Sequence, residues 1–436
     1  MKRRSFLQIG AVGGTVAALG VAPQKTRANS TITETEFDLT IAPANAEMID
    51  GTLVYTLQFF RGYDNPSPEL RVLEGERITI RVTNNDTQSH QFAIPGVPDS
   101  YIHDVQPGQT RIAGFTAPKG GSYLYIDSSK GDLNRLMGLH GAFIVEPRNK
   151  GRTPSGSETP YSIEDHNPRL QALFDAFGNH PDFPGDRWRD GDLAREKLWL
   201  FSQVDPSLNA SVAAGEAIDP SQVTDNFLPR YFTINGLSGF DTAYHDKREG
   251  HEAHEGRAGR IMPSGKEGEP CLLRCLNAGL ATHACHIHGN HCLELSHSNY
   301  EHINEISNNI YEHDTWALLP LQRVDMMLPF RKPPDIPDEC WPPKEEPFPL
   351  RYVMHCHFEI SQTAGGGNYP QGAVTHWEMT APLSEIETEL IREPRSEPIS
   401  SPTLSSRDRA SDDTDRNERK REDRDRRGAD RRKRRR

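Results

Sequence analysis

Two short histidine-rich runs hold the side chains of this sequence that are best suited to chemistry. The first run is His283-Ala-Cys-His-Ile-His288-Gly and the second is His355-Cys356-His357. Imidazole together with thiolate is the ligand set of copper electron-transfer sites, and imidazole alone suits copper that meets oxygen. The residue types therefore predict a metal centre with redox chemistry.

The spacing of these residues predicts that strands position them. In an extended strand alternate side chains point to the same face. His286 and His288 would then share one face, His355 and His357 would share one face, and Cys356 would point the opposite way. The pattern predicts an imidazole-rich environment on one side of a sheet and a thiolate on the other.

The chain before these runs has the pattern of short strands and polar turns. Residues 70–83 alternate apolar and polar side chains around a turn at Glu74-Gly75, and residues 121–125 and 141–145 also suggest strands. We therefore predict an N-terminal β-domain over residues 35–147, built as a sandwich or Greek-key barrel.

A second β-domain is predicted over residues 196–385, because strand-like runs recur at 197–201, 231–234 and 271–276. Residues 148–195, rich in Pro, Gly and Asp, would be a connector with one helix around residues 168–177. Residues 386–436 contain almost no apolar side chain, so we expect a disordered charged tail. The predicted fold class is all-β with long loops.

The charge of the chain is unevenly distributed. The net charge is −12 over 436 residues, but residues 1–28 carry five Lys or Arg and no acid, and residues 407–436 carry fifteen Lys or Arg against nine Asp or Glu. Residues 29–406 therefore have a net charge of −23. A body this acidic repels nucleic acid and attracts cations, so no nucleic-acid partner is expected.

The N-terminus indicates export. Lys2-Arg3-Arg4 precedes a Gly- and Ala-rich apolar run that extends to about residue 22. Adjacent arginines before a short apolar region are typical of a twin-arginine signal peptide, here residues 1–28, and the run is short for a spanning helix. We expect a periplasmic or extracellular protein without a membrane span in the mature chain.

The disulfide pairing of the cysteines cannot be derived from the sequence. The sequence has six, and their pattern does not determine disulfide connectivity. These are Cys271, Cys275, Cys285, Cys292, Cys340 and Cys356. Some could pair in an oxidising compartment.

The order of the motifs resembles the multicopper oxidase family, whose domains are cupredoxin-like, over roughly residues 40–385. His283-x-x-His286-x-His288-Gly289 and Met354-His355-Cys356-His357 match two of the family's copper motifs in order. The glycine-rich run at 361–372 is similar to a bacterial branch of the family. The resemblance implies two cupredoxin-like Greek-key domains and copper as the cofactor.

The resemblance also implies roles for individual residues. His283 and Cys356 would bind the type 1 copper, which accepts electrons from the reductant, and so would be the catalytic pair. His286 would bind the type 2 copper, and His288, His355 and His357 would bind the type 3 pair. The backbone of Cys356 would link the two sites.

Several family positions depart from the pattern. The first family motif keeps only His90, which we retain as a metal ligand, and the second keeps no histidine at residues 126–128. The second type 1 histidine falls on Ser361 or Asn368, and the axial position falls on Ala373. Four other histidines could compensate: His103, His140, His291 and His376.

Three interpretations therefore stay open. The first is an exported copper oxidoreductase that oxidises a small reductant, a phenol or a metal ion, with oxygen as the acceptor. The second is a divergent cupredoxin-fold copper-binding protein with an incomplete copper set and limited or no oxidase activity. The third is a metal-free module on the same fold. The chain could be a monomer or a homo-oligomer, and in a ring a neighbouring copy could supply histidines that this chain lacks.

Overall fold

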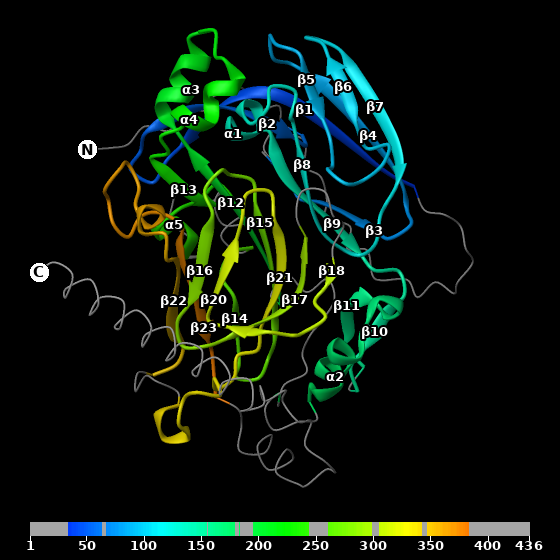
Figure 1. The fold of residues 1–436 in the computed structure, drawn as a ribbon, viewed down its shortest axis with the longest axis vertical. Helices are drawn as coiled ribbons and strands as arrows, with labels where there is room; N and C mark the ends of the chain where they lie inside the picture. The colour runs from blue at the N-terminus through cyan, green and yellow to red at the C-terminus, as the bar shows by residue number, and fades with distance from the viewer. Residues whose placement is uncertain are drawn as a thin grey trace, which may run out of the picture.

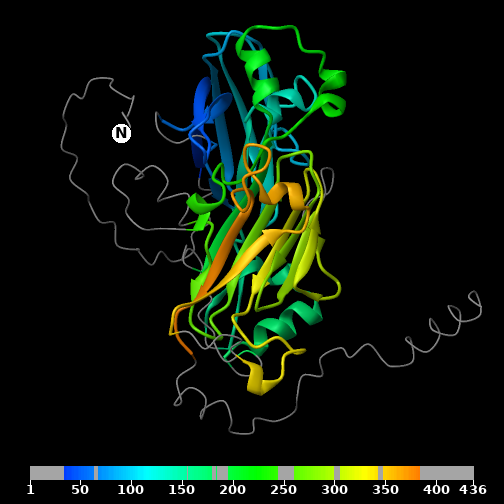
Figure 2. The ribbon, with the colours of Figure 1, turned by 90° about the vertical axis from the view of Figure 1, so that its left-hand side faces the viewer.

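The computed structural model describes residues 34–62, 67–154, 156–178, 183, 195–243, 260–298, 305–341 and 347–382. These residues form two β-domains, stacked end to end in Figures 1 and 2, with the first in blue and cyan and the second in green to orange. The predicted signal peptide, the charged tail and the histidines at 245, 251 and 254 lie outside the described residues. No helix among the described residues has the length and apolar character needed to cross a bilayer.

The N-terminal domain is a sandwich of mixed sheets. One sheet has the order β2-β1-β4-β7 and the other β3-β9-β8, with β5 and β6 paired beside them. Its strands are β1 Glu34–Glu47, β2 Leu53–Phe60, β3 Leu70–Leu73, β4 Arg77–Asn84, β5 His90–Phe92, β6 Ile102–Val105, β7 Thr110–Thr116, β8 Gly121–Ile126 and β9 His140–Glu146. Helix α1 Leu133–Leu136 lies between β8 and β9. The parallel pairs β1–β4 and β3–β9 require the crossover connections of a Greek-key fold.

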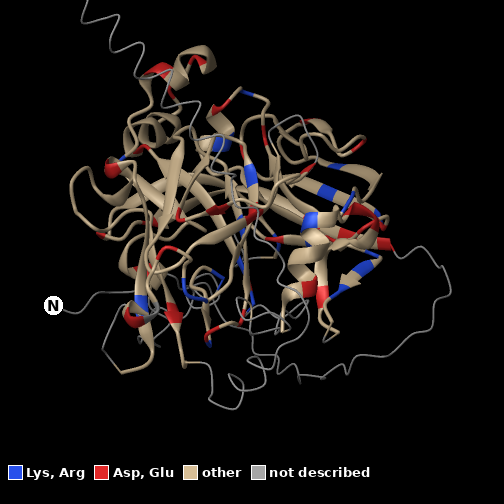
Figure 3. Ribbon diagram, turned by 60° about the horizontal axis from the view of Figure 1, so that its bottom comes forward, with Lys and Arg blue, Asp and Glu red and all other residues tan. Residues whose placement is uncertain are grey.

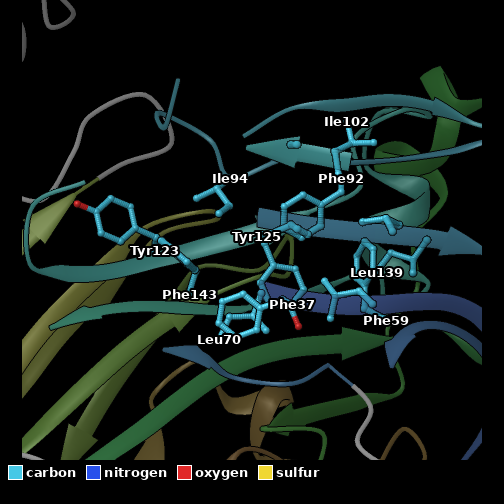
Figure 4. Close-up of a cluster of buried hydrophobic side chains, with 14 of the residues drawn as sticks. Phe37, Phe59, Leu70, Phe92, Ile94, Ile102, Tyr123, Tyr125, Leu139 and Phe143 are labelled. Carbon is cyan, nitrogen blue, oxygen red and sulfur yellow. The ribbon is translucent and has the colours of Figure 1, made fainter. Parts of the chain in front are cut away.

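Alternation of side chains explains this sandwich. Along β4, every second residue from Ile78 to Asn84 is buried, and the residues between them are only partly covered. The predicted turn at Glu74-Gly75 separates β3 from β4, and Gly75 has φ +69°, a conformation that glycine adopts without a Cβ clash. Aromatic side chains fill the space between the sheets (Figure 4), and Phe59, Phe92 and Tyr125 pack ring against ring.

The predicted connector contains more regular structure than the sequence indicated. Helix α2, Pro168–Ala176, confirms the predicted helix, and the Asn167 side chain accepts hydrogen bonds from the N–H groups of Arg169 and Leu170 at its start. Strands β10 Lys150–Arg152 and β11 Glu158–Ser162 form a hairpin that was not predicted. These strands are short and polar, and so they lack the apolar alternation by which a strand is recognised.

The C-terminal domain is a second sandwich. One sheet has the order β13-β12-β15-β21-β17-β18, with β19 paired to β17, and the facing sheet has the order β14-β23-β22-β16-β20. Its strands are β12 Glu196–Val204, β13 Tyr231–Ile234, β14 Ser264–Gly265, β15 Cys271–Asn277, β16 His283–Ile287, β17 Cys292–Ser298, β18 Glu305–Ile306, β19 Glu312–His313, β20 Thr315–Leu318, β21 Arg323–Leu328, β22 Leu350–Cys356 and β23 Val374–Met379. The all-β fold class with two cupredoxin-like domains is confirmed.

Short helices lie in the loops between the strands of the second domain. The α-helices are α3 Pro206–Ala213, α4 Val223–Asn226 and α5 Phe240–Ala243. The 3₁₀ helices of this domain are η2 Pro220–Gln222, η3 Asp338–Cys340 and η4 Glu359–Gln362, and a further one, η1 Ile163–Asp165, lies in the connector. The excursion that holds α3 and α4 was not predicted. It lies against the first domain, where the amide of Asn209 donates to the carbonyl of Tyr55.

Strands β8 and β9 join the two domains. Tyr123, Tyr125 and Phe143 point into the N-terminal core. The alternate residues Leu124, Ile126, Ala142 and Ile144 pack with Leu198 and Leu200 of β12, Leu276 of β15 and Ala278, which follows β15. Both faces of these strands are therefore buried, which accounts for their nearly continuous apolar sequence.

Candidate metal centre

The two histidine-rich runs lie on neighbouring antiparallel strands, β16 and β22. His286 is paired with His355, and Cys285 is paired with Cys356. The alternation predicted from the sequence is present, since Cys285 and Cys356 are buried whereas His286 and His355 are only partly covered. His288 and His357 follow the strand ends and are exposed. The sheet thus has an outer face with four imidazoles and an inner face with a thiol.

The outer face gathers side chains at metal-ligand spacing. One ring nitrogen from each of His286, His288 and His355 lies within 4.8 Å of the other two. The Nε2 atoms of His288 and His355 are 3.0 Å apart. The ring of His357 borders the group, with its centroid 4.6 Å from that of His286 and 4.9 Å from that of His355. This spacing suits an ion that contacts nitrogen at about 2 Å.

Strand β20 orients the ring of His286. Its Nδ1 lies 2.9 Å from the carbonyl oxygen of Asp314 and 2.8 Å from Oγ1 of Thr315. Since Nδ1–H donates to these oxygens, Nε2 is left as the ligand atom. A hydrogen bond of this kind fixes the tautomer of a metal-binding histidine. Nothing in the sequence around Asp314 and Thr315 had indicated this role.

The environment of the outer imidazoles favours their neutral, unprotonated form. Burial lowers the pKa of His288 and of His355, and the neighbouring imidazoles lower both pKa values further. A neutral imidazole presents the lone pair that a metal needs.

The inner face brings His283 and Cys356 to the same side of the sheet. The Cys356 sulfur accepts hydrogen bonds from the N–H groups of Ala284 at 3.3 Å and Phe358 at 3.4 Å. Burial lowers the pKa of His283 to about 4, so its ring is neutral. Its Nδ1 is buried without a hydrogen-bond partner. A cysteine sulfur and an imidazole nitrogen without a partner, both on the inner face of the sheet, are the ligand types of a copper electron-transfer site.

Gln203 contacts the other nitrogen of His283. Its side-chain oxygen accepts the N–H groups of Leu280 and Ala281, and its amide nitrogen faces Nε2 of His283 at 3.0 Å. Nε2 therefore accepts this hydrogen bond, and Nδ1 carries the proton. A metal that binds Nδ1 would displace that proton and require the Gln203 amide to turn.

The remaining type 1 positions offer no further imidazole. Ser361 is buried, and its hydroxyl donates to the carbonyl of Phe358 at 2.7 Å. The N–H of Ala373 donates to the carbonyl of Ser361, and Asn368 is exposed. His376 cannot compensate, because it pairs with Val353 and so lies on the outer face, where its Nε2 is 3.3 Å from Glu378. The hydrogen bond with His376 is the main cause that lowers the pKa of Glu378 to about 2.

His90, predicted as a metal ligand, has a different environment. Its Nδ1 lies 2.7 Å from Asp127 and its Nε2 lies 2.9 Å from Asp86, and both carboxylates are buried. Burial alone would lower the pKa of His90, but the hydrogen bonds to Asp127 and Asp86 outweigh it and raise the pKa. With both nitrogens donating to carboxylates, His90 has no lone pair for a metal. The structure does not bring it to the outer cluster.

The other compensating histidines also have separate roles. The ring of His103 stacks on Tyr101, and Nδ1 of buried His140 donates to the carbonyl of Arg135. Burial lowers the pKa of His140 to about 4. His291 lies between Glu312 at 3.7 Å and Asp335 at 3.5 Å. Among the described residues, His286, His288 and His355 form the one group with metal-ligand spacing.

Comparison with known proteins supports the resemblance. Residues 59–150 match the family model described as multicopper oxidase. No curated protein matches the chain in sequence. The fold is similar to that of a blue copper oxidase from Nitrosomonas europaea (TM-score 0.56, 20% identity, covering 79% of this chain and 86% of the other).

Two further solved structures share the fold. The multicopper oxidase mgLAC has a TM-score of 0.53 and 19% identity, over 80% of this chain and 86% of the other. A copper nitrite reductase from Nitrosomonas europaea has a TM-score of 0.50 and 14% identity, over 80% of this chain and 94% of the other. At these identities the likeness concerns the fold. Together with the match at residues 59–150, it confirms the resemblance of this chain to the multicopper oxidase family and indicates copper as its cofactor.

Proposed function

We propose that the chain is an exported copper-dependent oxidoreductase that oxidises a small reductant, a phenol or a metal ion, with oxygen as the acceptor. The observation that carries this proposal is the use of both faces of the β16–β22 pair. The inner face holds His283 and Cys356, and the outer face holds His286, His288, His355 and His357. Copper bound at the two faces would supply one-electron chemistry on one side and oxygen chemistry on the other.

The chain itself connects the two faces. Cys356 is bonded through the backbone to His355 and His357, whose rings lie in the outer cluster. An electron that enters at the thiolate therefore has a short covalent route to the outer imidazoles. His288 and His357 are exposed, so a small acceptor can reach the outer face.

The charge of the molecule bears on the reductant. The residues between the basic ends carry a net charge of −23, and Figure 3 shows Asp and Glu distributed over the described ribbon with Lys and Arg among them. An acidic surface raises the local concentration of cations. This favours a metal ion or an uncharged phenol over an anionic reductant. The twin-arginine pattern at residues 2–4 supports export, which would place this chemistry in the periplasm or outside the cell.

A second candidate is a divergent copper-binding protein with little or no oxidase activity. It is favoured by the carboxylates around His90 and by Ser361 and Ala373 at the type 1 positions, which leave few imidazoles for a full copper set. A neighbouring copy that supplied histidines would restore the first candidate.

Copper content and spectra of the full chain separate these functions. An oxidase requires a complete set of type 1, type 2 and paired type 3 copper, an intense blue absorption band and oxygen consumption. The second candidate predicts fewer copper ions and no oxygen consumption. A chain that binds no copper contradicts both.

Substitution of the thiolate tests the electron route. We expect Cys356→Ser to remove the blue band and to abolish oxidase turnover, because the serine oxygen cannot replace the thiolate. The control is Cys340→Ser, since Cys340 is an exposed free thiol away from the strands. Oxidase activity that survives in Cys356→Ser would show that electrons do not enter through this residue.

A further inference from the structure

Cys285 and Cys356 face each other across the β16–β22 pair. They are direct partners in the antiparallel register, and both are buried free thiols, of which Cys285 belongs to the hydrophobic core of the second domain. Two residues opposite each other in a sheet point to the same face, so the two sulfur atoms share the inner face.

The hydrogen bonds of the ladder define the geometry of this pair. The N–H of His288 donates to the carbonyl of Val353, and the N–H of His357 donates to the carbonyl of Ala284. These bonds place Cys285 and Cys356 at a position without mutual backbone hydrogen bonds. Cα atoms at such positions are about 4.5 Å apart. Disulfides span Cα distances of about 4.4–6.8 Å.

Other buried cysteines of the same domain lack this arrangement. Cys271 is paired with Leu328, Cys275 is paired with Val324, and Cys292 is paired with His313. These residues are equally buried. The geometry thus distinguishes Cys285 and Cys356 from thiols that merely fill the core.

We propose that Cys285 and Cys356 form a reversible cross-strand disulfide that competes with copper for the Cys356 thiolate. This rests on the proposed function only in assigning Cys356 as a copper ligand. The oxidant is a small-molecule disulfide. The Cys356 thiolate attacks one of its sulfur atoms and releases a thiolate, and Cys285 then loses its proton and attacks the Cys356 sulfur in the mixed disulfide, releasing the second thiolate.

The exchange balances and is reversible. The two protein thiols lose two electrons and two protons, and the small disulfide gains them as two thiols. Cys356 lies at the end of β22, where the N–H groups of Ala284 and Phe358 donate to its sulfur. Since both side chains are fully buried, the exchange proceeds through local opening and is slow. The disulfide would protect the ligand thiol from irreversible oxidation before copper arrives.

The first experiment needs no copper. The copper-free full chain is equilibrated under native conditions with mixtures of reduced and oxidised dithiothreitol, then unfolded and alkylated, and its peptides are analysed by mass spectrometry. We expect a Cys285–Cys356 link, with Cys271, Cys275 and Cys292 alkylated. The link should be absent in Cys285→Ala and retained in the matched core variant Cys275→Ala. A folded wild-type chain that lacks the link in the most oxidising mixture overturns the proposal.

The second experiment tests the competition. Copper is added to the reduced chain and to the oxidised chain, and bound copper and the blue band are measured. We expect the oxidised chain to give a band at least about tenfold weaker, restored by reduction. Copper at the outer histidines should be retained, because they face the other way. In Cys285→Ala the oxidising treatment should leave the band unchanged.

The two experiments separate this proposal from the proposed function. If the Cys285–Cys356 disulfide forms but the reduced chain shows no blue band with copper, Cys356 is not a copper ligand and the disulfide proposal still holds. If the reduced chain shows the blue band but the disulfide never forms, the disulfide proposal is wrong and Cys356 remains a copper ligand. A linked chain that keeps its full blue band refutes the competition.

Discussion

At the scale of single residues, His90 lies at a position expected to bind a metal but forms ion pairs with carboxylates instead. The imidazole lies between two buried carboxylates, Asp86 and Asp127, and Asn134 also donates to Asp127 at 2.9 Å. The alternation of histidines in the two runs was predictable because a strand imposes its period of two regardless of context. The surroundings of His90 were not predictable, because Asp127 comes from a segment remote in sequence.

Removal of the His90 imidazole should destabilise the first domain. In His90→Leu two buried carboxylates lose their positively charged partner, a change that typically costs about 3–5 kcal/mol. The free energy of unfolding in urea would measure this. The control is His103→Leu, since His103 is exposed and stacks on Tyr101. Equal unfolding midpoints for the two variants would contradict an ion-paired role for His90.

The contribution of His90 should depend on pH. Its pKa in the folded chain is raised above the ordinary 6.5, so the stabilisation is complete below pH 6.5 and is lost as the pH rises through the folded pKa. The stability gap between wild type and His90→Leu should therefore narrow as the pH rises above 6.5. Unfolding curves at a series of pH values would test this, and a gap that stayed constant above pH 6.5 would show that His90 is neutral when folded.

At the scale of elements, strand β20 determines how β16 presents its metal ligands. Thr315 is paired with His286 across these strands, and its hydroxyl lies 2.8 Å from the ring. The sequence predicted the strands around the two runs because apolar alternation reveals buried faces. It did not predict the neighbour of β16, since strand order depends on the whole sandwich. The helices α3 and α4 were missed for a related reason: they are short and lie against the first domain.

Loss of the Thr315 hydroxyl should weaken copper binding at the outer face. Thr315→Val keeps the shape of the side chain but removes one acceptor for Nδ1–H of His286. Changes to such supporting groups typically lower metal affinity by about 10–100-fold. Competition with a copper chelator would measure the affinity. The matched control is Thr375→Val on β23, since Thr375 lies on the inner face and its hydroxyl bonds to the carbonyl of Thr242. Equal affinities in the two variants would exclude a role for Thr315.

At the scale of the whole molecule, a buried network of charges joins the two domains. Glu196 of β12 accepts from Arg274 of β15 at 3.0 Å and from Arg71 of β3 in the first domain. Asp325 of β21 accepts from Arg274 at 3.1 Å and from Ser122 of β8 at 2.6 Å. Burial would raise the pKa of Glu196, but Arg274 and Arg71 outweigh it and hold the pKa far below its usual range. The sequence identified the two β-domains but not this network, because its charged partners come from four strands that are far apart in the sequence.

Neutralising Glu196 should loosen the domain interface. In Glu196→Gln the buried guanidinium of Arg274 keeps Asp325 as its carboxylate partner, and Arg71 loses its ion pair with the second domain. We therefore expect a loss of about 3 kcal/mol in the free energy of unfolding. Because the folded pKa of Glu196 is lowered, its contribution in wild type is present above about pH 4.5 and declines as the pH falls. The difference between variant and wild type should therefore shrink in acid. The control is Glu36→Gln, which removes an exposed pair with Arg81 and should leave the unfolding midpoint unchanged. If Glu196→Gln matched this control at neutral pH, the apolar contact of β8 and β9 with β12 and β15 would be sufficient to hold the domains together.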